Sequence, residues 1–179
     1  MKIKEIDNCI GWNYADKIEA LVTSLNFPWY YLEDITYVND NTSVKVPGFS
    51  HLLYDRMNRY EGRDLAFLSP LLFHIAQDEV REFVRMKISM LLKSDRTEPN
   101  NKHIDHSFPH TTILYYVSDS DGDTIFYNGD EIIHRVTPKK GKAVIFDGLI
   151  YHASSCPQSY SRRYTINMNY RNYTFEGER

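Results

Sequence analysis

Residues 103–170 read HIDHSFPHTTILYYVSDSDGDTIFYNGDEIIHRVTPKKGKAVIFDGLIYHASSCPQSYSRRYTINMNY. Short runs of β-branched and aromatic residues alternate here with turn sequences such as Asn128-Gly129-Asp130 and Asp147-Gly148. These runs are typical of strands, and many short strands at this spacing indicate a β-sandwich or barrel. We expect strands over residues 111–117, 124–127, 131–137, 142–146, 150–154 and 163–170.

Two helices are expected before this stretch. Residues 13–25 have apolar positions at helical spacing, up to Leu25, and Asn13 is a candidate cap. Ser69-Pro70 predicts the start of a second helix, which we expect to end near 82–85. Because helices precede strands, the predicted fold is mainly β (α+β), a double-stranded β-helix (jelly roll) with the N-terminal helices packed on one sheet. Further strands are expected over 27–32, 48–54 and 86–93.

The length of 179 residues suits a single domain. We expect residues 1–92 to support a catalytic jelly-roll core over 93–171. The polar segments 39–50 and 94–102 are predicted to be loops that shape the mouth of a site.

The composition is that of a soluble globular protein, with 42% hydrophobic residues and a net charge of −3. This charge argues against nucleic acid or an anionic membrane as a partner. The N-terminus lacks the apolar core of a signal peptide, and no run of eighteen apolar residues occurs. We therefore expect a cytoplasmic protein in which Cys9 and Cys156 are free thiols, with one disulfide as the alternative.

One set of residues has the spacing of a metal site. His103-x-Asp105 is followed 49 residues later by His152 (152 − 103). On an extended segment the side chains of His103 and Asp105 point the same way, and we expect His152 to come from a strand lying opposite. Two imidazoles and one carboxylate can bind one face of Fe(II) and leave positions open. Zinc is the rival metal, but nothing resembles the helical His-Glu-x-x-His motif of zinc proteases.

Arg163 begins a strand with two different faces. Arg163, Thr165 and Asn167 share one face, whereas the apolar residues from Tyr164 to Tyr170 share the other. A polar face inside a jelly roll is costly unless it binds something polar, and a guanidinium suits a carboxylate. Arg162 points to the opposite face and is expected to be exposed.

The other histidines have simpler interpretations. We expect His51, His74 and His134 to be structural or surface residues, and His106 to lie near the metal ligands or on the surface. A contact between His110 and a substrate stays open. The sequence around Asp121 resembles a calcium loop only superficially, and the lysines at 139–142 are expected to form a solvated turn.

Residues 103–170 resemble the catalytic core of the 2-oxoglutarate- and Fe(II)-dependent dioxygenases, most closely the prolyl-4-hydroxylase-like branch in its compact phage and bacterial form. The matching pieces are His103-x-Asp105, Tyr115-Tyr116, residues 121–124, residues 138–146, His152 and Arg163-Tyr164-x-Ile166.

The resemblance implies a role for each matching position. The metal triad falls on His103, Asp105 and His152, and these are also the implied catalytic residues. Arg163 would pair with the distal carboxylate of 2-oxoglutarate. The remaining implied cosubstrate positions are Tyr116, Thr112 and Thr165. The short loop after Asp105 leaves the choice between Tyr115 and Tyr116 open. The alternation of side chains along a strand favours Thr112, Leu114 and Tyr116 on one face.

The implied activity is hydroxylation of a C–H bond, with 2-oxoglutarate and O2 converted to succinate and CO2 and with ascorbate as a candidate reductant. A peptidyl proline is the first candidate, within a wider class of peptide, protein or small-molecule substrates. A metal-binding, cupin-like jelly roll without oxygenase activity and a structural β-sandwich are the alternatives. The oligomeric state stays open.

Overall fold

The computed structural model describes residues 3–36, 45–77 and 80–172. Residues 39–44 of the expected loop 39–50 lie outside these described residues. Its helices are α1 (Trp12–Val22) and α2 (Leu65–Ala76). Its strands are β1 (Ile3–Ile6), β2 (Tyr30–Leu32), β3 (Gly48–Asp55), β4 (Tyr60–Glu61), β5 (Glu82–Leu92), β6 (Thr111–Tyr116), β7 (Thr124–Asn128), β8 (Glu131–Val136), β9 (Ala143–Asp147), β10 (Tyr151–Ser154) and β11 (Arg162–Arg171).

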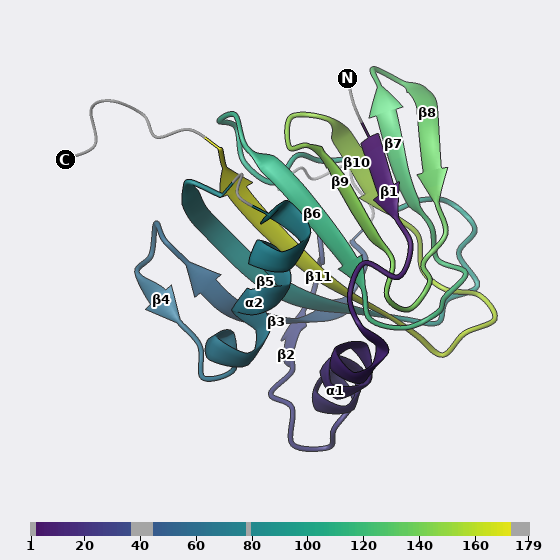
Figure 1. Ribbon diagram of the computed structural model, residues 1–179. Coiled ribbons are helices and arrows are strands. Elements are labelled where there is room, and N and C mark those ends of the chain that lie inside the picture. The colour runs from purple at the N-terminus through teal and green to yellow at the C-terminus, as the bar shows by residue number, and fades with distance from the viewer. Residues whose placement is uncertain (1–2, 37–44, 78–79, 173–179) are drawn as a thin grey trace.

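Two antiparallel sheets form the jelly roll (Figure 1). The larger sheet has the order β1-β9-β6-β11-β5-β3-β2, with β4 paired to β3, and the smaller has the order β10-β7-β8. Apolar side chains join the two sheets, including Tyr116 and Phe146 from the larger and Phe126 from the smaller. The predicted fold class is therefore confirmed.

Both helices pack on the outer face of the larger sheet. Ile18 of α1 and Leu72 of α2 are fully buried in one cluster with Ile88 of β5 and Ile166 of β11. Fully burying such a side chain contributes about 1.5–3 kcal/mol. The expected packing of the helices on one sheet follows from these contacts.

The predicted ends of α1 were wrong. Its N-cap is Gly11, no side chain caps it, and it ends at Val22. Leu25 therefore lies beyond the helix, with a relative exposure of 103%. The predicted strand over 27–32 is also shorter, because only Tyr30–Leu32 pair with β3.

The predicted bounds of α2 were wrong at both ends. The helix starts at Leu65, so that Pro70 lies inside it, and Gln77 ends it with φ +55°. The chain then enters β5 at Glu82, where a helix was expected. Buried residues alternate with partly buried ones from Val84 to Met90, and this period of two favours a strand.

Strand β11 lies in the middle of the larger sheet, between β5 and β6. Ile166, Met168 and Tyr170 point to the helices and are fully buried. Arg163 and Asn167 alternate with them and face the smaller sheet. The two faces predicted for this strand are therefore present.

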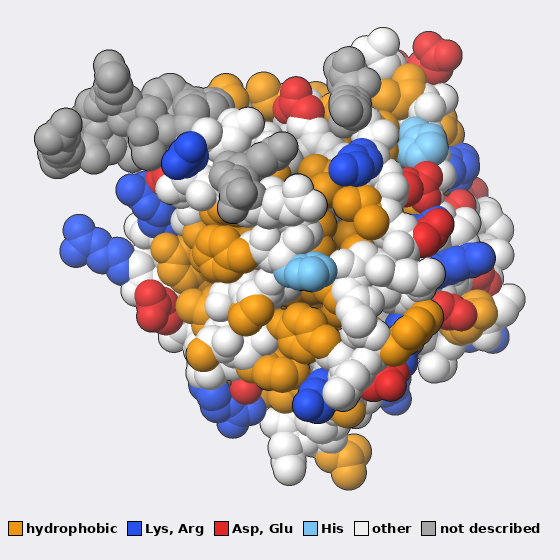
Figure 2. Space-filling view, viewed as in Figure 1, with side chains coloured by type: hydrophobic (Ala, Val, Ile, Leu, Met, Phe, Trp, Pro, Cys, Tyr) orange, Lys and Arg blue, Asp and Glu red, His pale blue; other side chains and the backbone are white. Residues whose placement is uncertain are grey.

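The face that carries α2 also exposes apolar surface. Figure 2 shows hydrophobic side chains gathered there, and Phe67 and Phe73 of α2 are 38% and 49% exposed. No helix in the described part of the chain has both the length and the hydropathy to cross a bilayer.

We predict that Leu72→Ala lowers the free energy of unfolding by about 2–5 kcal/mol, because it opens a cavity between α2 and the sheet. Leu25→Ala is the matched control and should change it by less than about 0.5 kcal/mol. Urea denaturation measures both variants. An equal loss of unfolding free energy in the two variants would contradict the assigned packing of α2.

Candidate metal centre

His103 and His152 lie next to each other across a short antiparallel bridge. The amide of His103 donates to the His152 carbonyl at 2.9 Å, and the amide of His152 donates back at 3.0 Å. His152 belongs to β10, which lies directly opposite the His103 segment across this bridge. The bridge sets the two rings 4.7 Å apart, centroid to centroid.

The backbone also selects one tautomer of each ring. Nδ1 of His103 lies 3.1 Å from the carbonyl of Asn101, and Nδ1 of His152 lies 3.1 Å from that of Ile150. A carbonyl only accepts, so each Nδ1 holds the hydrogen and each Nε2 keeps a lone pair. Metal-binding histidines commonly have this arrangement.

The carboxylate of Asp105 is held by three side chains from the larger sheet. Arg85 Nη2 donates to Oδ1 at 2.7 Å, and Asn167 and Asn169 donate to Oδ2 at 2.9 and 3.0 Å. Arg85 also donates to Asn169, at 3.1 Å, which holds the set together. A carboxylate offers about four lone-pair positions, so one position on Oδ1 stays available.

The electrostatic environment keeps Asp105 and His103 in metal-binding form. Burial alone would raise the pKa of Asp105, but Arg85, His152 and Lys87 hold it well below its usual range. Burial and the neighbouring His152 lower the pKa of His103 to about 4. A charged carboxylate and a neutral imidazole are the forms that bind a divalent metal.

The three side chains can therefore share one ion. One ligand atom from each of His103, Asp105 and His152 lies within 4.8 Å of the others. Two imidazole nitrogens and one carboxylate oxygen fit Fe(II) with open positions. The donor set thus agrees with the metal that the sequence predicts.

A buried cation lies beside this triad. Arg163 is 4% exposed, and its Nε donates to the Gly122 carbonyl at 2.6 Å. Its Nη2 donates to Thr124 Oγ1 at 2.8 Å, and the Tyr116 hydroxyl donates to the same oxygen at 2.7 Å. A Cβ at Gly122 would lie 2.4 Å from the Ser155 carbonyl, so only glycine allows this approach.

The structure brings together some of the other implied residues and separates others. Tyr116 and Thr165 are register partners and lie on the face of Arg163, whereas Tyr115 packs in the core under the helices. Thr112 instead accepts a hydrogen bond from Asn169 at 3.0 Å, and so belongs to the group around Asp105. Arg162 is exposed and contacts the Tyr164 hydroxyl.

The sequence analysis missed the contribution of β5. Arg85, Lys87 and Ser89 alternate with apolar residues and lie opposite Asn169, Asn167 and Thr165 in the sheet. The alternation of polar and apolar side chains, which predicts the two faces of β11, also predicts that these three residues share the polar face of β5. Arg85 lies where the sequence predicts the end of a helix, whereas Lys87 and Ser89 lie in the predicted strand 86–93.

The remaining histidines lie outside the triad. His51 is buried, with Nδ1 2.9 Å from the Pro28 carbonyl, and His134 contacts Glu5 at 2.9 Å. His74 is exposed. His106 stacks on Phe108 and meets His110 edge-on. None of the five lies within the group that can share the ion.

Two adjoining cavities reach the triad. The inner one, about 60 Å³, runs past His103 and His152 to Arg163 and Thr124. The outer one, about 590 Å³, is lined by the triad residues His103 and Asp105 and by Arg85, Lys87 and Tyr151. Of the predicted mouth segments, 94–102 contributes Lys102 to the outer cavity.

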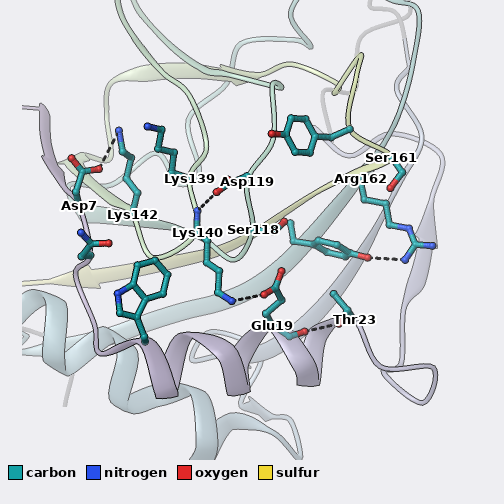
Figure 3. A pocket seen from close by; sticks show the side chains of 14 residues that line it. Asp7, Glu19, Thr23, Ser118, Asp119, Lys139, Lys140, Lys142, Ser161 and Arg162 are labelled. Atoms are coloured by element: carbon teal, nitrogen blue, oxygen red, sulfur yellow. Dashed lines mark hydrogen bonds and ion pairs between the residues drawn. The ribbon is translucent and has the colours of Figure 1, made fainter.

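A different pocket lies over α1, away from the triad (Figure 3). Two of its lysines contact acids: Lys140 contacts Glu19 at 2.5 Å and Lys142 contacts Asp7 at 3.4 Å. None of the candidate ligands lines this pocket. It is therefore not part of the metal centre.

Solved structures share this fold over almost the whole chain. An oxidoreductase of the 2OG-Fe(II) oxygenase family from Burkholderia pseudomallei has a TM-score of 0.74 at 11% identity, covering 96% of this chain and 86% of its own. A Trichoplax adhaerens prolyl hydroxylase, in complex with a hypoxia inducible factor oxygen degradation domain peptide fragment, has a TM-score of 0.66 at 15% identity. The match covers 95% of this chain and 83% of that one. A Pseudomonas putida prolyl-4-hydroxylase has a TM-score of 0.62 at 13% identity, and the match covers 94% of this chain and 92% of that one.

No protein-family model and no curated protein matches the sequence. The structural likeness confirms the resemblance at the level of the fold: this chain has the jelly roll of the 2OG-Fe(II) oxygenases.

We predict that Arg85→Met destabilises the metal-free protein by about 3–5 kcal/mol, because it leaves the buried Asp105 carboxylate without its cation. Saturating Mn(II) should recover part of this loss, since the ion replaces the missing positive charge. Urea denaturation with and without Mn(II) measures the effect, and Arg135→Met, at an exposed position, is the control. The same loss in both conditions would show that Arg85 acts on packing alone.

Proposed function

We propose that this protein is an Fe(II)- and 2-oxoglutarate-dependent dioxygenase that hydroxylates a C–H bond. In the proposed reaction, one oxygen atom of O2 enters the substrate as a hydroxyl group and the other enters succinate, with loss of CO2. The bound ferrous ion would supply the redox chemistry with O2 and the keto acid.

The observation that best supports this proposal is the burial of Arg163 in the cavity that also contacts His103 and His152. No carboxylate in the described ranges lies within ion-pair distance of Arg163, although burying a guanidinium is costly. A dicarboxylic acid with one end at the metal and the other at Arg163 would match this charge.

Each of these residues has a defined task in the proposed site. His103, Asp105 and His152 would hold the metal, and Asn167 and Asn169 orient Asp105. Arg163 would bind the distal carboxylate through N–H groups that Gly122 and Thr124 leave available. Burial raises the pKa of Tyr116 to about 12, so its hydroxyl stays protonated and keeps its hydrogen bond to Thr124, which in turn accepts from Arg163.

The two alternatives explain less of the site. A purely structural role as a β-sandwich does not explain a buried His-Asp-His group or the guanidinium beside it. A cupin-like metal protein accounts for the three ligands but not for Arg163.

For the substrate we propose a peptide or protein, with proline as the first candidate side chain. The support is the fold shared with two prolyl hydroxylases, one of them in complex with a peptide. A small-molecule substrate is the alternative, and ascorbate is a candidate reductant. A cytoplasmic location also stays a prediction, with which the free thiols Cys9 and Cys156 agree.

We predict that Asp105→Ala and His152→Ala abolish Fe(II)-dependent succinate release from 2-oxoglutarate, because each removes one of three ligands. Metal analysis of the purified variants should show loss of bound iron. His74→Ala, on the exposed side of α2, should keep wild-type turnover. A folded triad variant that still releases succinate would refute the assignment.

Arg163→Met should raise the 2-oxoglutarate concentration for half-maximal turnover about tenfold or more, since a charge-assisted hydrogen bond is lost. Iron binding should stay unchanged. Arg163→Lys retains the charge, so its 2-oxoglutarate concentration for half-maximal turnover should lie between those of wild type and Arg163→Met. Arg162→Met alters the exposed neighbour and is the control. An unchanged requirement in Arg163→Met would mean that another group anchors the cosubstrate.

A further inference from the structure

We propose that His110 is a positioning residue of the metal centre, which sets the place of the ligand His152 by holding the turn before it. This inference rests on the proposed function, since it adds a residue to the same site. His110 lies directly before β6 and is 5% exposed. It lines neither of the two cavities beside the triad, so its role is support and not contact with a substrate.

The imidazole ring of His110 is held in one orientation. Its Nδ1 lies 2.8 Å from the carbonyl oxygen of Phe108, and because a carbonyl only accepts, Nδ1 carries the hydrogen. The ring also packs edge-on against the Phe108 ring, with the centroids 5.7 Å apart. Burial, this hydrogen bond and the ring contact together resist a rotation of the side chain.

The ring fills the space that a side chain at Gly148 would need. A Cβ there would lie 2.1 Å from Nε2 of His110, and 2.3 and 2.4 Å from the two ring carbons beside it. Gly148 lies outside the left-handed backbone region, in which Gly129 and Gly141 are found. Glycine is therefore required here by the ring and not by the backbone conformation. The Gly148 amide also donates to the His110 carbonyl at 2.8 Å.

Gly148 belongs to the turn that leads into β10 and His152. The Ile150 amide donates to the Asp147 carbonyl at 2.9 Å, which closes the turn, and the Ile150 side chain is 2% exposed. The Ile150 carbonyl is the acceptor for Nδ1 of His152, at 3.1 Å. Because a hydrogen bond of this kind orients a metal-binding histidine, a displacement of Gly148 reaches the ligand through Ile150.

His110 also contacts the segment that carries the other two ligands. Its ring meets the ring of His106 edge-on, with the centroids 5.2 Å apart, and His106 directly follows Asp105. One buried ring thus lies between the segment of His103 and Asp105 and the turn before His152. Ligands from two segments can share one ion only at a fixed separation, and this ring helps to fix it.

Gly148→Ala and His110→Ala test this role, alone and combined. Gly148→Ala places a methyl group against the ring and should weaken Mn(II) binding about tenfold or more, as is typical when the support of a metal ligand is lost. His110→Ala only removes atoms and should weaken binding by a smaller factor. The combined variant should bind Mn(II) more tightly than Gly148→Ala, because the methyl group then occupies the space of the missing ring. Independent damage from the two substitutions would instead add.

Calorimetric titration of the full chain with Mn(II) measures the affinities. The visible absorption of Co(II)-loaded protein gives a second readout, since it depends on where the ligands lie around the ion. It should change in Gly148→Ala and return towards wild type in the combined variant. Gly11→Ala is the control, because a Cβ there meets nothing within 4 Å, and both readouts should stay at wild-type values. If Gly148→Ala does not fold, recovery of a folded, Mn(II)-binding protein in the combined variant is the expected rescue.

The proposal is overturned if Gly148→Ala and His110→Ala bind Mn(II) as wild type does, or if the combined variant binds no more tightly than Gly148→Ala. Succinate release by wild type tests the oxygenase function separately. The expected rescue without succinate release would refute the proposed function but not the role of His110. Succinate release with no effect of the variants on Mn(II) binding would do the reverse, and a wild type that binds no metal would refute both.

Discussion

The alternation of side chains along β11 connects the hydrophobic core to the candidate site. Ile166 and Met168 are buried against the helices, and this contact holds the strand in one register. A shift by one residue would move every apolar side chain to the wrong face. The positions of Arg163 and Asn167 in the interior therefore follow from packing on the opposite side of the same strand.

The interior of the jelly roll contains two separate groups of charges. Near one end of β11, Arg163 is held by neutral acceptors, namely a carbonyl and a hydroxyl group. Further along the strand, Asp105 is held by Arg85 and two asparagine amides. The metal ligand is thus balanced before any ion binds, whereas the guanidinium meets no described carboxylate. This difference is why the cavity beside Arg163 suits an anion.

Short-range patterns predicted most of the strands and the identity of the triad. The six strands expected after residue 110 all formed, with ends that differ by at most one residue. The errors lie where two patterns compete, as between α2 and β5, where a proline-led helix signal obscured an alternation of period two. Pro70 lies inside α2, because burial of Leu68, Leu71 and Leu72 stabilises the turns around it.

The sequence by itself determined the fold class, the order His-x-Asp, His, Arg, and the two faces of β11, because these depend on local periodicity. Only the tertiary structure placed His152 beside His103, turned Tyr116 rather than Tyr115 towards Arg163, and brought Arg85 to Asp105. These relations join segments that are up to 49 positions apart in the sequence (His103 to His152). They depend on how the sheets pair and pack, and no local pattern contains that information.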